Sequence, residues 1–285
     1  MNLSHGARRR APASVGLLLQ SWRKTRNLSQ LGLAVQAEMS SRHLCFVETG
    51  RANPSREMIL RLANALDVPL RERNALLLAG GFAPQYAESK LDAPALAAVN
   101  GALQAILSQQ EPFPAVVMNR HWDVVRANGA ASRFFGFLLG ERRAAAPSNV
   151  LRMMFDPAAL RPFVRNWNEV AAALVLRVRR EAIGGVPDDV TERLLTEVLS
   201  YPGVPPELRA AGLHLPLLPV VPVSFTKGRQ RFDFFSAITT LGTPQDITVQ
   251  ELRIESFFPA DEATRAAAAR LAARGSATAA TRSKR

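Results

Sequence analysis

The chain is poor in cysteine and in long apolar runs. Among its 285 residues Cys45 is the single cysteine, which excludes an intramolecular disulfide and fits a reducing interior. No apolar run approaches the roughly 18 residues that a membrane-spanning helix needs. Near the N-terminus Arg8-Arg9-Arg10 precedes an apolar stretch, but that stretch is too short for the core of a signal peptide. These absences predict a cytoplasmic protein without a membrane span.

Catalytic and metal-binding patterns are also missing. The 4 histidines are scattered, and no His/Cys/carboxylate cluster has the spacing of metal ligands. His43 and Cys45 are close in sequence, but no further such residue nearby completes a site. The sequence has no HExxH, GxSxG, P-loop or dinucleotide-binding glycine pattern, and Asp188-Asp189 is interpreted as a helix cap. We therefore expect no enzyme activity, no catalytic residues, no metal and no cofactor.

Positive charge gathers at the two ends of the chain. The net charge is +12, and residues 1–85 hold 12 basic against 5 acidic residues. Residues 86–264 hold 18 basic against 19 acidic residues, and residues 265–285 hold 6 basic residues and no acidic one. This distribution is expected if the head binds a polyanion and the middle does not. The alternative is that the basic ends only keep the protein soluble.

Residues 15–80 are predicted to form five short amphipathic helices. Ser29 and Ser40 are placed to cap the second and third helices, and Gly50 to end the third. Pro54-Ser55 opens the fourth helix, and the fifth runs from Leu70 to Ala79. The apolar positions of the first helix recur at the spacing of one helical face: Val15, Leu18, Leu19 and Trp22. This pattern predicts a compact all-α domain.

Several separated blocks within this region resemble known DNA-binding families. Leu28-Ser29-Gln30, Leu33-Ala34, Ser40–Leu44 and Val47–Arg51 resemble the helix-turn-helix of the lambda-repressor-like (Cro/CI, or XRE) family. The blocks Arg42–Glu57, Leu66–Asn74 and Gly80–Pro84 resemble the head of MmyB-like regulators. The resemblance implies an internal ion pair between Arg23 and Glu48. Glu38 departs from the pattern, because relatives usually have glycine at this turn; in the left-handed region it would carry strain on the order of 1 kcal/mol.

The third helix is the expected recognition helix. Leu44 and Val47 supply its buried side, which leaves Arg42 and Phe46 on the face that enters the major groove. Arg42 can donate to guanine, and Phe46 can pack on a thymine methyl; alternatively, Arg42 is only solvated and Phe46 belongs to the core. The resemblance also implies DNA contacts by five further residues: Gln30, Ser40, Ser41, Arg51 and Asn53.

Behind the head the pattern predicts strands, then helices, then strands. Ala115–Met118 and Val124–Ala127 are expected to form a hairpin, helices follow within residues 128–139 and 157–200, and strands return at 220–225, 231–241 and 248–258. Leu252 and Ile254 alternate with charged residues, as in a half-buried strand. The order indicates an α+β domain whose sheet pairs segments far apart in sequence.

This second region resembles a PAS-type sensor fold and the ligand-binding domain of MmyB-like regulators. The resemblance is carried by Glu111–Val117, Trp122–Asn128, Leu241–Asp246 and Glu251–Asp261, with Asn119 where relatives commonly have aspartate. We divide the chain into a helix-turn-helix domain at 1–85, a linker at 86–93, a PAS-like α+β domain at 94–263 and a basic, partly disordered tail at 264–285.

A PAS-like sheet with helices on one face can enclose an apolar cavity of about 300–1,000 Å³. Large, adaptable side chains on both the strand and the helical segments are candidates for lining it, although any one of them can equally be core. The candidate ligand-binding residues are Phe113, Trp122, Phe134, Phe135, Trp167, Phe232 and Phe234, with Met153, Met154 and Phe155 as further candidates. Such a lining suits something long and apolar, such as a fatty acid.

The sequence therefore predicts a two-domain, α+β regulator of transcription. Its partners are expected to be double-stranded operator DNA, a second copy of the chain in a homodimer, and an apolar small molecule. One alternative is a ligand-independent repressor whose C-terminal domain only dimerises. Another is an antitoxin-like regulator whose C-terminal domain binds another protein.

Overall fold

A computed structural model describes residues 14–140, 148–183, 188–209 and 220–282. The chain divides into two compact units, with the main boundary between Glu88 and Ser89, inside the predicted linker, and with residues Gln245–Ile247 grouped with the first unit. Residues just before the boundary pack on the first unit: the amide of Asn74 accepts from the N–H groups of Gln85 and Tyr86 and donates to the Tyr86 carbonyl. Within the described residues no helix is long and apolar enough to cross a membrane.

The first unit is the predicted bundle of five helices. They are α1 (Val15–Thr25), α2 (Gln30–Gln36), α3 (Ser41–Glu48), α4 (Arg56–Ala65) and α5 (Leu70–Ala79). Four of them begin in the same way, because a serine side chain accepts a hydrogen bond from the backbone N–H three residues later. These caps are Ser14, Ser29, Ser40 and Ser55, so the predicted starts of the second, third and fourth helices are confirmed.

One apolar face of each helix contributes to the core of this bundle. The large buried members are Leu19, Trp22, Leu33, Leu44, Val47, Ile59, Leu62, Leu66, Val68, Leu76 and Leu77. Helices α1 and α3 come especially close: a β-carbon at Gly16 would lie 2.2 Å from the Val47 carbonyl oxygen. Glycine is therefore required at position 16, and this contact fixes α3 against α1.

The second unit is built on one five-stranded antiparallel sheet. Its strands are β1 (Ala115–Met118), β2 (Val124–Ala127), β3 (Val223–Lys227), β4 (Gln230–Thr239) and β5 (Arg253–Pro259), in the order β2-β1-β5-β4-β3. The first and last strands along the chain lie side by side, with Val117 opposite Ile254. The predicted pairing of segments far apart in sequence is confirmed.

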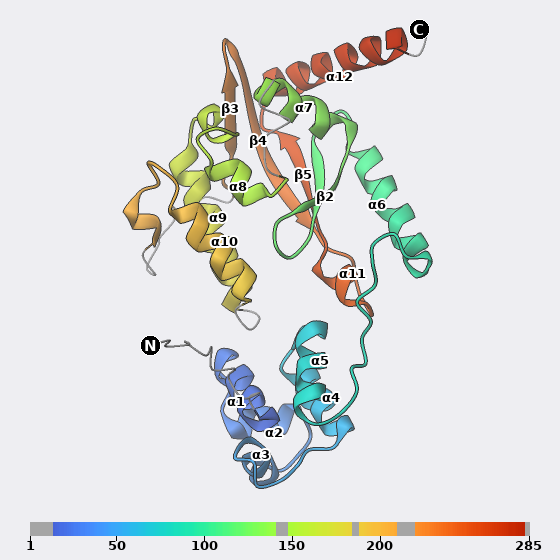
Figure 1. Cartoon of the computed structure of the whole chain (residues 1–285), viewed down its shortest axis with the longest axis vertical. Helices are drawn as coiled ribbons and strands as arrows, with labels where there is room; N and C mark the ends of the chain where they lie inside the picture. The colour runs from blue at the N-terminus through green and yellow to red at the C-terminus, as the bar shows by residue number, and fades with distance from the viewer. Residues whose placement is uncertain (1–13, 141–147, 184–187, 210–219, 283–285) are drawn as a thin grey trace, which may run out of the picture. The chain divides into compact units, whose positions relative to one another are not determined.

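Helices cover both faces of this sheet (Figure 1). Figure 1 shows α8 (Val150–Phe155), α9 (Trp167–Ile183) and α10 (Asp189–Leu199) on one side and α6 (Ala97–Gln109) on the other. The remaining helices are α7 (Gly129–Leu139), α11 (Ile247–Glu251) and α12 (Glu262–Arg282), with short 3-10 turns η1 (Pro94–Leu96), η3 (Arg161–Phe163) and η4 (Pro206–Arg209). We call the side of α7–α10 the inner face of the sheet.

All four residues of β1 are buried because both faces of that strand are covered. Ala115 and Val117 pack with Leu103 and Leu107 of α6, whereas Val116 and Met118 belong to the larger core on the inner face. Successive side chains of a strand point to opposite faces. β1 is therefore buried on both faces, and its alternate side chains contact different helices.

Two segments differ from their predicted form. Residues 248–258 were expected to be one strand, but Ile247–Glu251 is helix α11 and the strand begins at Arg253. The cause is tertiary: the Ile247 N–H donates to the Ala87 carbonyl at 2.8 Å, and the Thr248 hydroxyl donates to the Ser89 carbonyl at 2.7 Å. The alternation of apolar and polar residues in 248–258 carries no information about these two carbonyl groups, which lie about 160 positions earlier in the chain.

The segment predicted as a tail from residue 264 begins as part of the folded domain. Helix α12 starts at Glu262, and its first turns pack against α7 and β4. Thr264 is buried and its hydroxyl accepts from the Asp233 N–H at 2.9 Å, while Ala267 and Ala268 are also buried. Residues 283–285, the end of the predicted partly disordered tail, lie outside the described residues.

Candidate DNA interface and ligand pocket

Helix α3 presents the expected face to solvent. Leu44 and Val47 are fully buried, whereas Arg42 is exposed and Phe46 is half-buried. The guanidinium carbon of Arg42 lies 5.6 Å from the centroid of the Phe46 ring, within the range of a cation–π contact. Phe46 does not belong to the buried cluster of the bundle. The guanidinium of Arg42 is therefore available on the outer face of α3, and the major groove of DNA is wide enough to admit an α-helix.

A buried ion pair holds the C-terminal end of α3. Arg23 donates to both carboxylate oxygens of Glu48, at 2.6 and 2.8 Å, and Glu48 is 2% exposed. Burial by itself raises the pKa of Glu48, but hydrogen bonds from Arg23 and Gln30 outweigh it and keep the pKa below its ordinary value. The ion pair implied by the family resemblance is confirmed, and it connects α1 to α3.

The other predicted DNA contacts differ in their surroundings. Ser41, Arg51 and Asn53 are exposed. Ser40 is also exposed, but its hydroxyl caps α3 by accepting from the His43 N–H at 3.2 Å. Gln30 is half-buried and donates to Glu48 at 2.8 Å. The structure brings these residues to the start of α2 and around α3, and their contacts with DNA stay predictions.

The turn between α2 and α3 contains a residue in the left-handed region, the conformation in which a residue other than glycine carries strain. Glu38 lies in the left-handed region, with φ of +51°. The Met39 N–H donates to the Ala34 carbonyl at 2.9 Å, so the turn closes in spite of the side chain at position 38. Within the described residues no three His, Cys, Asp or Glu side chains gather to form a metal site, near α3 or elsewhere.

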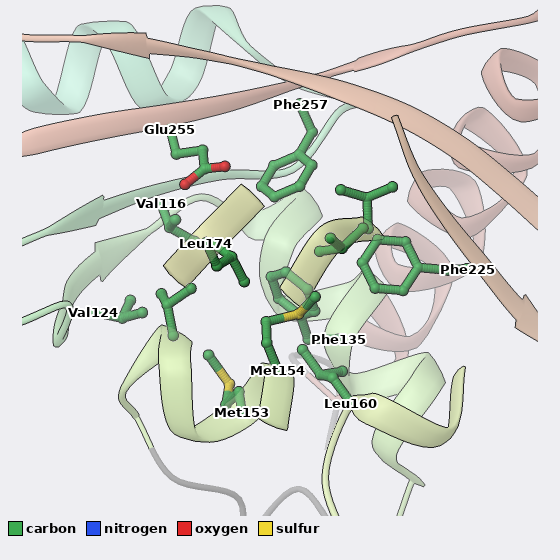
Figure 2. A pocket seen from close by; sticks show the side chains of 13 residues that line it. Val116, Val124, Phe135, Met153, Met154, Leu160, Leu174, Phe225, Glu255 and Phe257 are labelled. Atoms are coloured by element: carbon green, nitrogen blue, oxygen red, sulfur yellow. The ribbon is translucent and has the colours of Figure 1, made fainter. Parts of the chain in front are cut away.

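A small apolar pocket lies on the inner face of the sheet (Figure 2). Its volume is about 60 Å³. It is lined by Val116, Val124, Phe135, Val150, Met153, Met154, Leu160, Val170, Leu174, Val223, Phe225, Glu255 and Phe257. Figure 2 shows Glu255 and Phe257 reaching from one side toward the methionines and Leu160 on the other. Glu255 is the one charged residue in this lining.

The pocket is smaller than expected and most of the predicted lining residues lie elsewhere. Phe135, Met153 and Met154 do line it. Trp122, Phe134, Trp167, Phe232 and Phe234 are instead buried in the core, where the Phe134 ring meets the rings of Phe232 and Phe234 edge to face at 5.2 and 5.4 Å. These aromatic rings fill the space that the sequence reasoning left open for a ligand.

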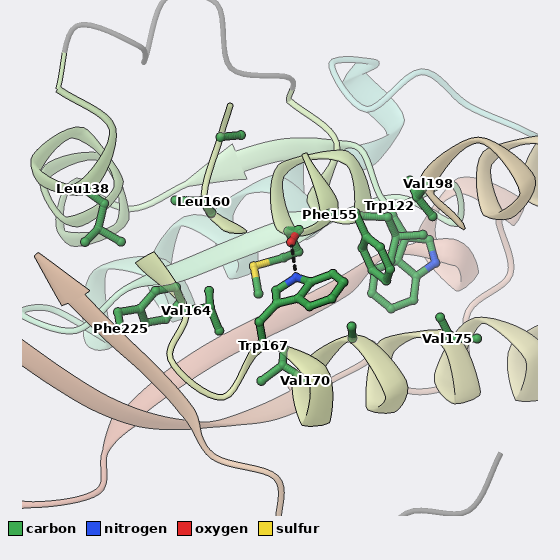
Figure 3. Close-up of a cluster of buried hydrophobic side chains, with 14 of the residues drawn as sticks. Trp122, Leu138, Phe155, Leu160, Val164, Trp167, Val170, Val175, Val198 and Phe225 are labelled. Carbon is green, nitrogen blue, oxygen red and sulfur yellow. Dashed lines mark hydrogen bonds between the residues drawn. The ribbon is translucent and has the colours of Figure 1, made fainter. Parts of the chain in front are cut away.

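Trp167 and Phe113, both predicted to line the pocket, have structural partners instead. The indole N–H of Trp167 donates to the Met154 carbonyl at 2.7 Å, and the Trp167 ring meets that of Phe155 edge to face at 5.6 Å (Figure 3). Phe113 is half-buried, and the guanidinium carbon of Arg265 from α12 lies 5.6 Å from its ring centroid. Composition identified apolar side chains correctly but did not separate those that pack from those that border a space.

A wider groove of about 500 Å³ adjoins the inner pocket. The two share Val170, Leu174, Val223 and Glu255, so these residues form the wall between them. The groove is further lined by Ala173, Arg177, Arg180, Glu181, Val220, Val221, Ser236 and Ile238. Together the two spaces form an apolar site with charged residues at one part of its rim.

A family profile described as "MmyB-like transcription regulator ligand binding domain" matches residues 99–271, more than half of the chain. The chain belongs to the MmyB-like transcription regulators. A second profile, described as "Helix-turn-helix domain", matches residues 14–76, which hold α1 to α5. The MmyB-like regulator thus joins a DNA-binding helix-turn-helix domain to a ligand-binding domain, and the predicted family and two-domain α+β fold are confirmed.

Other comparisons add little. No curated protein matches the chain. A solved structure titled "Structure of an RNA-binding Light-Oxygen-Voltage Receptor" has 13% sequence identity and a TM-score of 0.25; the match covers 93% of this chain and 63% of that one. The MmyB-like regulator therefore spans less than two thirds of that receptor, and the likeness is too weak to bear on its function.

Sequence reasoning missed the charged residues at the rim of the pocket. Glu255 alternates with Ile254 along β5, which suggested that it faced solvent. Because β5 is a central strand covered on both faces, Glu255 instead faces α9, and its Oε2 lies 3.5 Å from Nη1 of Arg177. The signal available in the sequence was the uninterrupted apolar run of β1, the neighbouring strand, because a strand covered on both faces has apolar residues at every position.

Proposed function

We propose that this MmyB-like regulator binds a specific operator as a homodimer and that an apolar, acyl-like ligand in the inner pocket changes its affinity for that operator. The observation that carries the proposal is the combination of an exposed Arg42 on the recognition helix with an apolar pocket in a matched ligand-binding domain. Because its partner is DNA, we expect the protein to act in the cytoplasm, as a regulator and not as an enzyme.

The DNA-binding part of the proposal is tested on α3. Replacing Arg42 with alanine removes the guanidinium available to a guanine edge, which costs about 1–3 kcal/mol of binding and relaxes the preference at one base pair. Replacing Arg51 instead weakens binding to all sequences alike. It also lowers by about one the magnitude of the slope of log binding constant against log salt concentration. Gel-shift titrations on specific and scrambled duplexes measure both effects.

A matched control is Arg61→Ala, which removes an exposed arginine from α4. Its affinity and its base preference should match those of the unchanged protein, apart from a small uniform electrostatic effect. If the Arg42 variant behaves like this control, α3 is not the recognition helix.

The ligand part depends on how the pocket can enlarge. A volume of about 60 Å³ is below the roughly 150 Å³ of a cavity that holds benzene. Met153 and Met154 line one side, and methionine side chains adapt their shape at low cost. An alkyl chain that enters from the groove can displace them, whereas a rigid ring would need the whole sheet to move. This favours a flexible, chain-like ligand.

Occupation of the pocket is tested by filling it. Val124→Phe places a ring in the pocket lining, whereas Val125→Phe makes the same change at the next position, which is 38% exposed and outside that lining. We expect straight-chain acyl compounds to stabilise the unchanged protein against heat; the first variant should lose this stabilisation, and the second should keep it. Equal responses from both variants would place the ligand elsewhere.

The small size of the pocket favours one competing function, in which the C-terminal domain only mediates protein–protein contacts. Mass spectrometry of the purified protein under native conditions separates the two. A retained apolar small molecule agrees with ligand sensing. A protein that carries none and that shows no thermal shift with any chain length would be a ligand-independent or antitoxin-like regulator.

A further inference from the structure

Glu255 stands where the inner pocket meets the groove. It lines both spaces, and its side chain is 13% exposed. Figure 2 shows its carboxylate on the same side of the pocket as Phe257, directed toward Leu174. A carboxylate is an unusual neighbour for an otherwise apolar pocket, because a buried charge needs polar partners. The partners of Glu255 therefore indicate what this junction can accept.

Arg177 of α9 is the cationic partner at this junction. Its Nη1 lies 3.5 Å from Oε2 of Glu255, which is at the limit of a hydrogen bond, and its Nε donates to Glu181 at 3.1 Å. The guanidinium carbon lies 4.4 Å from the ring centroid of Trp122, which holds the group in place. Its Nη2 is buried and has no hydrogen-bond partner in the described part of the chain. The junction thus has a carboxylate acceptor next to a guanidinium that keeps one buried N–H group without a partner.

The charged groups in direct contact at this junction cancel one another, and the exposed Arg180 is a further cation in the groove lining. Arg253 pairs with Glu181 at 3.2 Å, so two arginines and two carboxylates face one another across α9 and β5. A ligand carboxylate placed here would lie beside Glu255, and a ligand ammonium would lie beside Arg177; either meets a like charge in a poorly solvated place. An uncharged group that both donates and accepts hydrogen bonds disturbs neither pair.

We infer that the junction of Glu255 and Arg177 is the head-group site of the ligand and that it selects an amphipathic molecule with an uncharged hydroxyl or amide head. This inference rests on the proposed function, since it assumes that an alkyl chain occupies the apolar pocket. The head donates its O–H or N–H to Glu255 and accepts from Arg177, while the chain extends between β5 and α8. The head group, not the chain alone, then distinguishes the cognate ligand from common fatty acids.

The test compares four eight-carbon compounds that differ in their head groups. Isothermal titration of the full chain at pH 7.5 with 1-octanol, octanamide, octanoate and octylamine should give affinities for the alcohol and the amide at least ten-fold higher than for the two ions. Octanoate or octylamine binding as tightly as the alcohol would overturn the inference. Binding of none of the four would instead contradict the proposed function itself.

A substitution makes the result specific to the junction. Glu255→Gln removes the negative charge and keeps the size of the side chain, so octanoate affinity should rise at least ten-fold and the preference for the alcohol should disappear. Glu169→Gln is the matched control, because Glu169 is an exposed residue of α9 outside both linings. An unchanged ranking in a folded Glu255→Gln protein would overturn the inference; should that variant fail to fold, the ranking in the unchanged protein decides.

Discussion

At the scale of single residues, the ends of the helices in the DNA-binding domain depend on left-handed positions. Asn27, Glu38, Gly50 and Asp67 follow α1 to α4 with φ between +46° and +73°. Asparagine, aspartate and glycine visit this region readily, whereas a longer side chain with a β-carbon does so at a cost. Among these four residues, Glu38 is the one whose side chain disfavours the left-handed region. It is also exposed, so its side chain gains little from packing.

Replacing Glu38 with glycine should therefore stabilise the DNA-binding domain by about 0.5–1 kcal/mol. The relief of left-handed strain exceeds the extra entropy that glycine has in the unfolded chain. Urea unfolding followed by circular dichroism measures the change. Glu57→Gly, the same substitution in the first turn of α4, should lower stability, since there glycine loosens a helix and removes a carboxylate that favours its N-terminus. A loss of stability in the Glu38 variant would show that its side chain contributes more than the strain costs.

We expect Asp188 to make the stability of the ligand-binding domain depend on pH in the acid range. It caps α10 by accepting from the Val190 N–H at 3.0 Å, as predicted, and its Oδ2 lies 2.8 Å from Arg120 and 2.6 Å from His121. Burial alone raises its pKa, but the Val190 N–H, Arg120 and His121 together outweigh that effect and lower the pKa to about 2. A depressed carboxylate pKa stabilises the folded state above the unfolded pKa near 4.

We therefore expect Asp188→Asn to cost at most about 2 kcal/mol at neutral pH, because asparagine keeps the cap and loses the ionic partners. The difference from the unchanged protein should be constant above about pH 5 and should shrink as the pH falls from about 4 to 2, as Asp188 becomes protonated. Thermal unfolding across this range measures it. A difference that stayed constant down to pH 2 would mean that the ionised form of Asp188 is not the stabilising one.

At the scale of elements, Asn128 joins three segments of the ligand-binding domain. Its side-chain oxygen accepts from the N–H groups of Ala115 in β1 and Ala131 in α7, at 3.0 and 2.8 Å. Its side-chain nitrogen donates to the carbonyls of Phe113 and Leu107, at 2.8 and 3.2 Å. One buried amide thus satisfies backbone groups at the end of α6, the start of β1 and the first turn of α7.

Asn128→Ala should destabilise the ligand-binding domain by about 3 kcal/mol, because it removes a helix cap and leaves buried backbone groups without partners. Asn168→Ala, at an exposed position of α9, is the matched control and should change stability by less than about 0.5 kcal/mol. Equal losses from both variants would show that the four hydrogen bonds of Asn128 add no net stability. Differential scanning calorimetry separates this domain from the helical head if the two unfold in distinct transitions.

At the scale of the whole molecule, the proposed coupling of ligand binding to DNA binding depends on assembly. A single recognition helix reads few base pairs, and two helices about 34 Å apart on one face of DNA read a palindrome with much higher affinity. Our proposal therefore requires two copies of the chain on one operator. A ligand that changes the spacing of the two heads changes affinity without touching DNA.

Light scattering should accordingly give twice the monomer mass for the free protein or for its complex with a palindromic duplex. A saturating acyl ligand should leave that mass unchanged and shift the midpoint of the DNA titration. The homodimer would be ruled out if one chain bound one palindromic duplex at protein concentrations far above the dissociation constant for DNA. In that case the ligand would have to act within a single chain.

The sequence by itself determined the local features: serine caps, apolar stripes and most of the order of strands and helices. These follow from interactions within about ten residues, so a pattern in the chain predicts them. Tertiary structure decided which aromatic rings pack in the core and which border the pocket. It also made residues 247–251 helical and placed Glu255 opposite Arg177. Those outcomes depend on which distant residues fill each face of β1 and β5, and the periodicity of one strand does not contain that information.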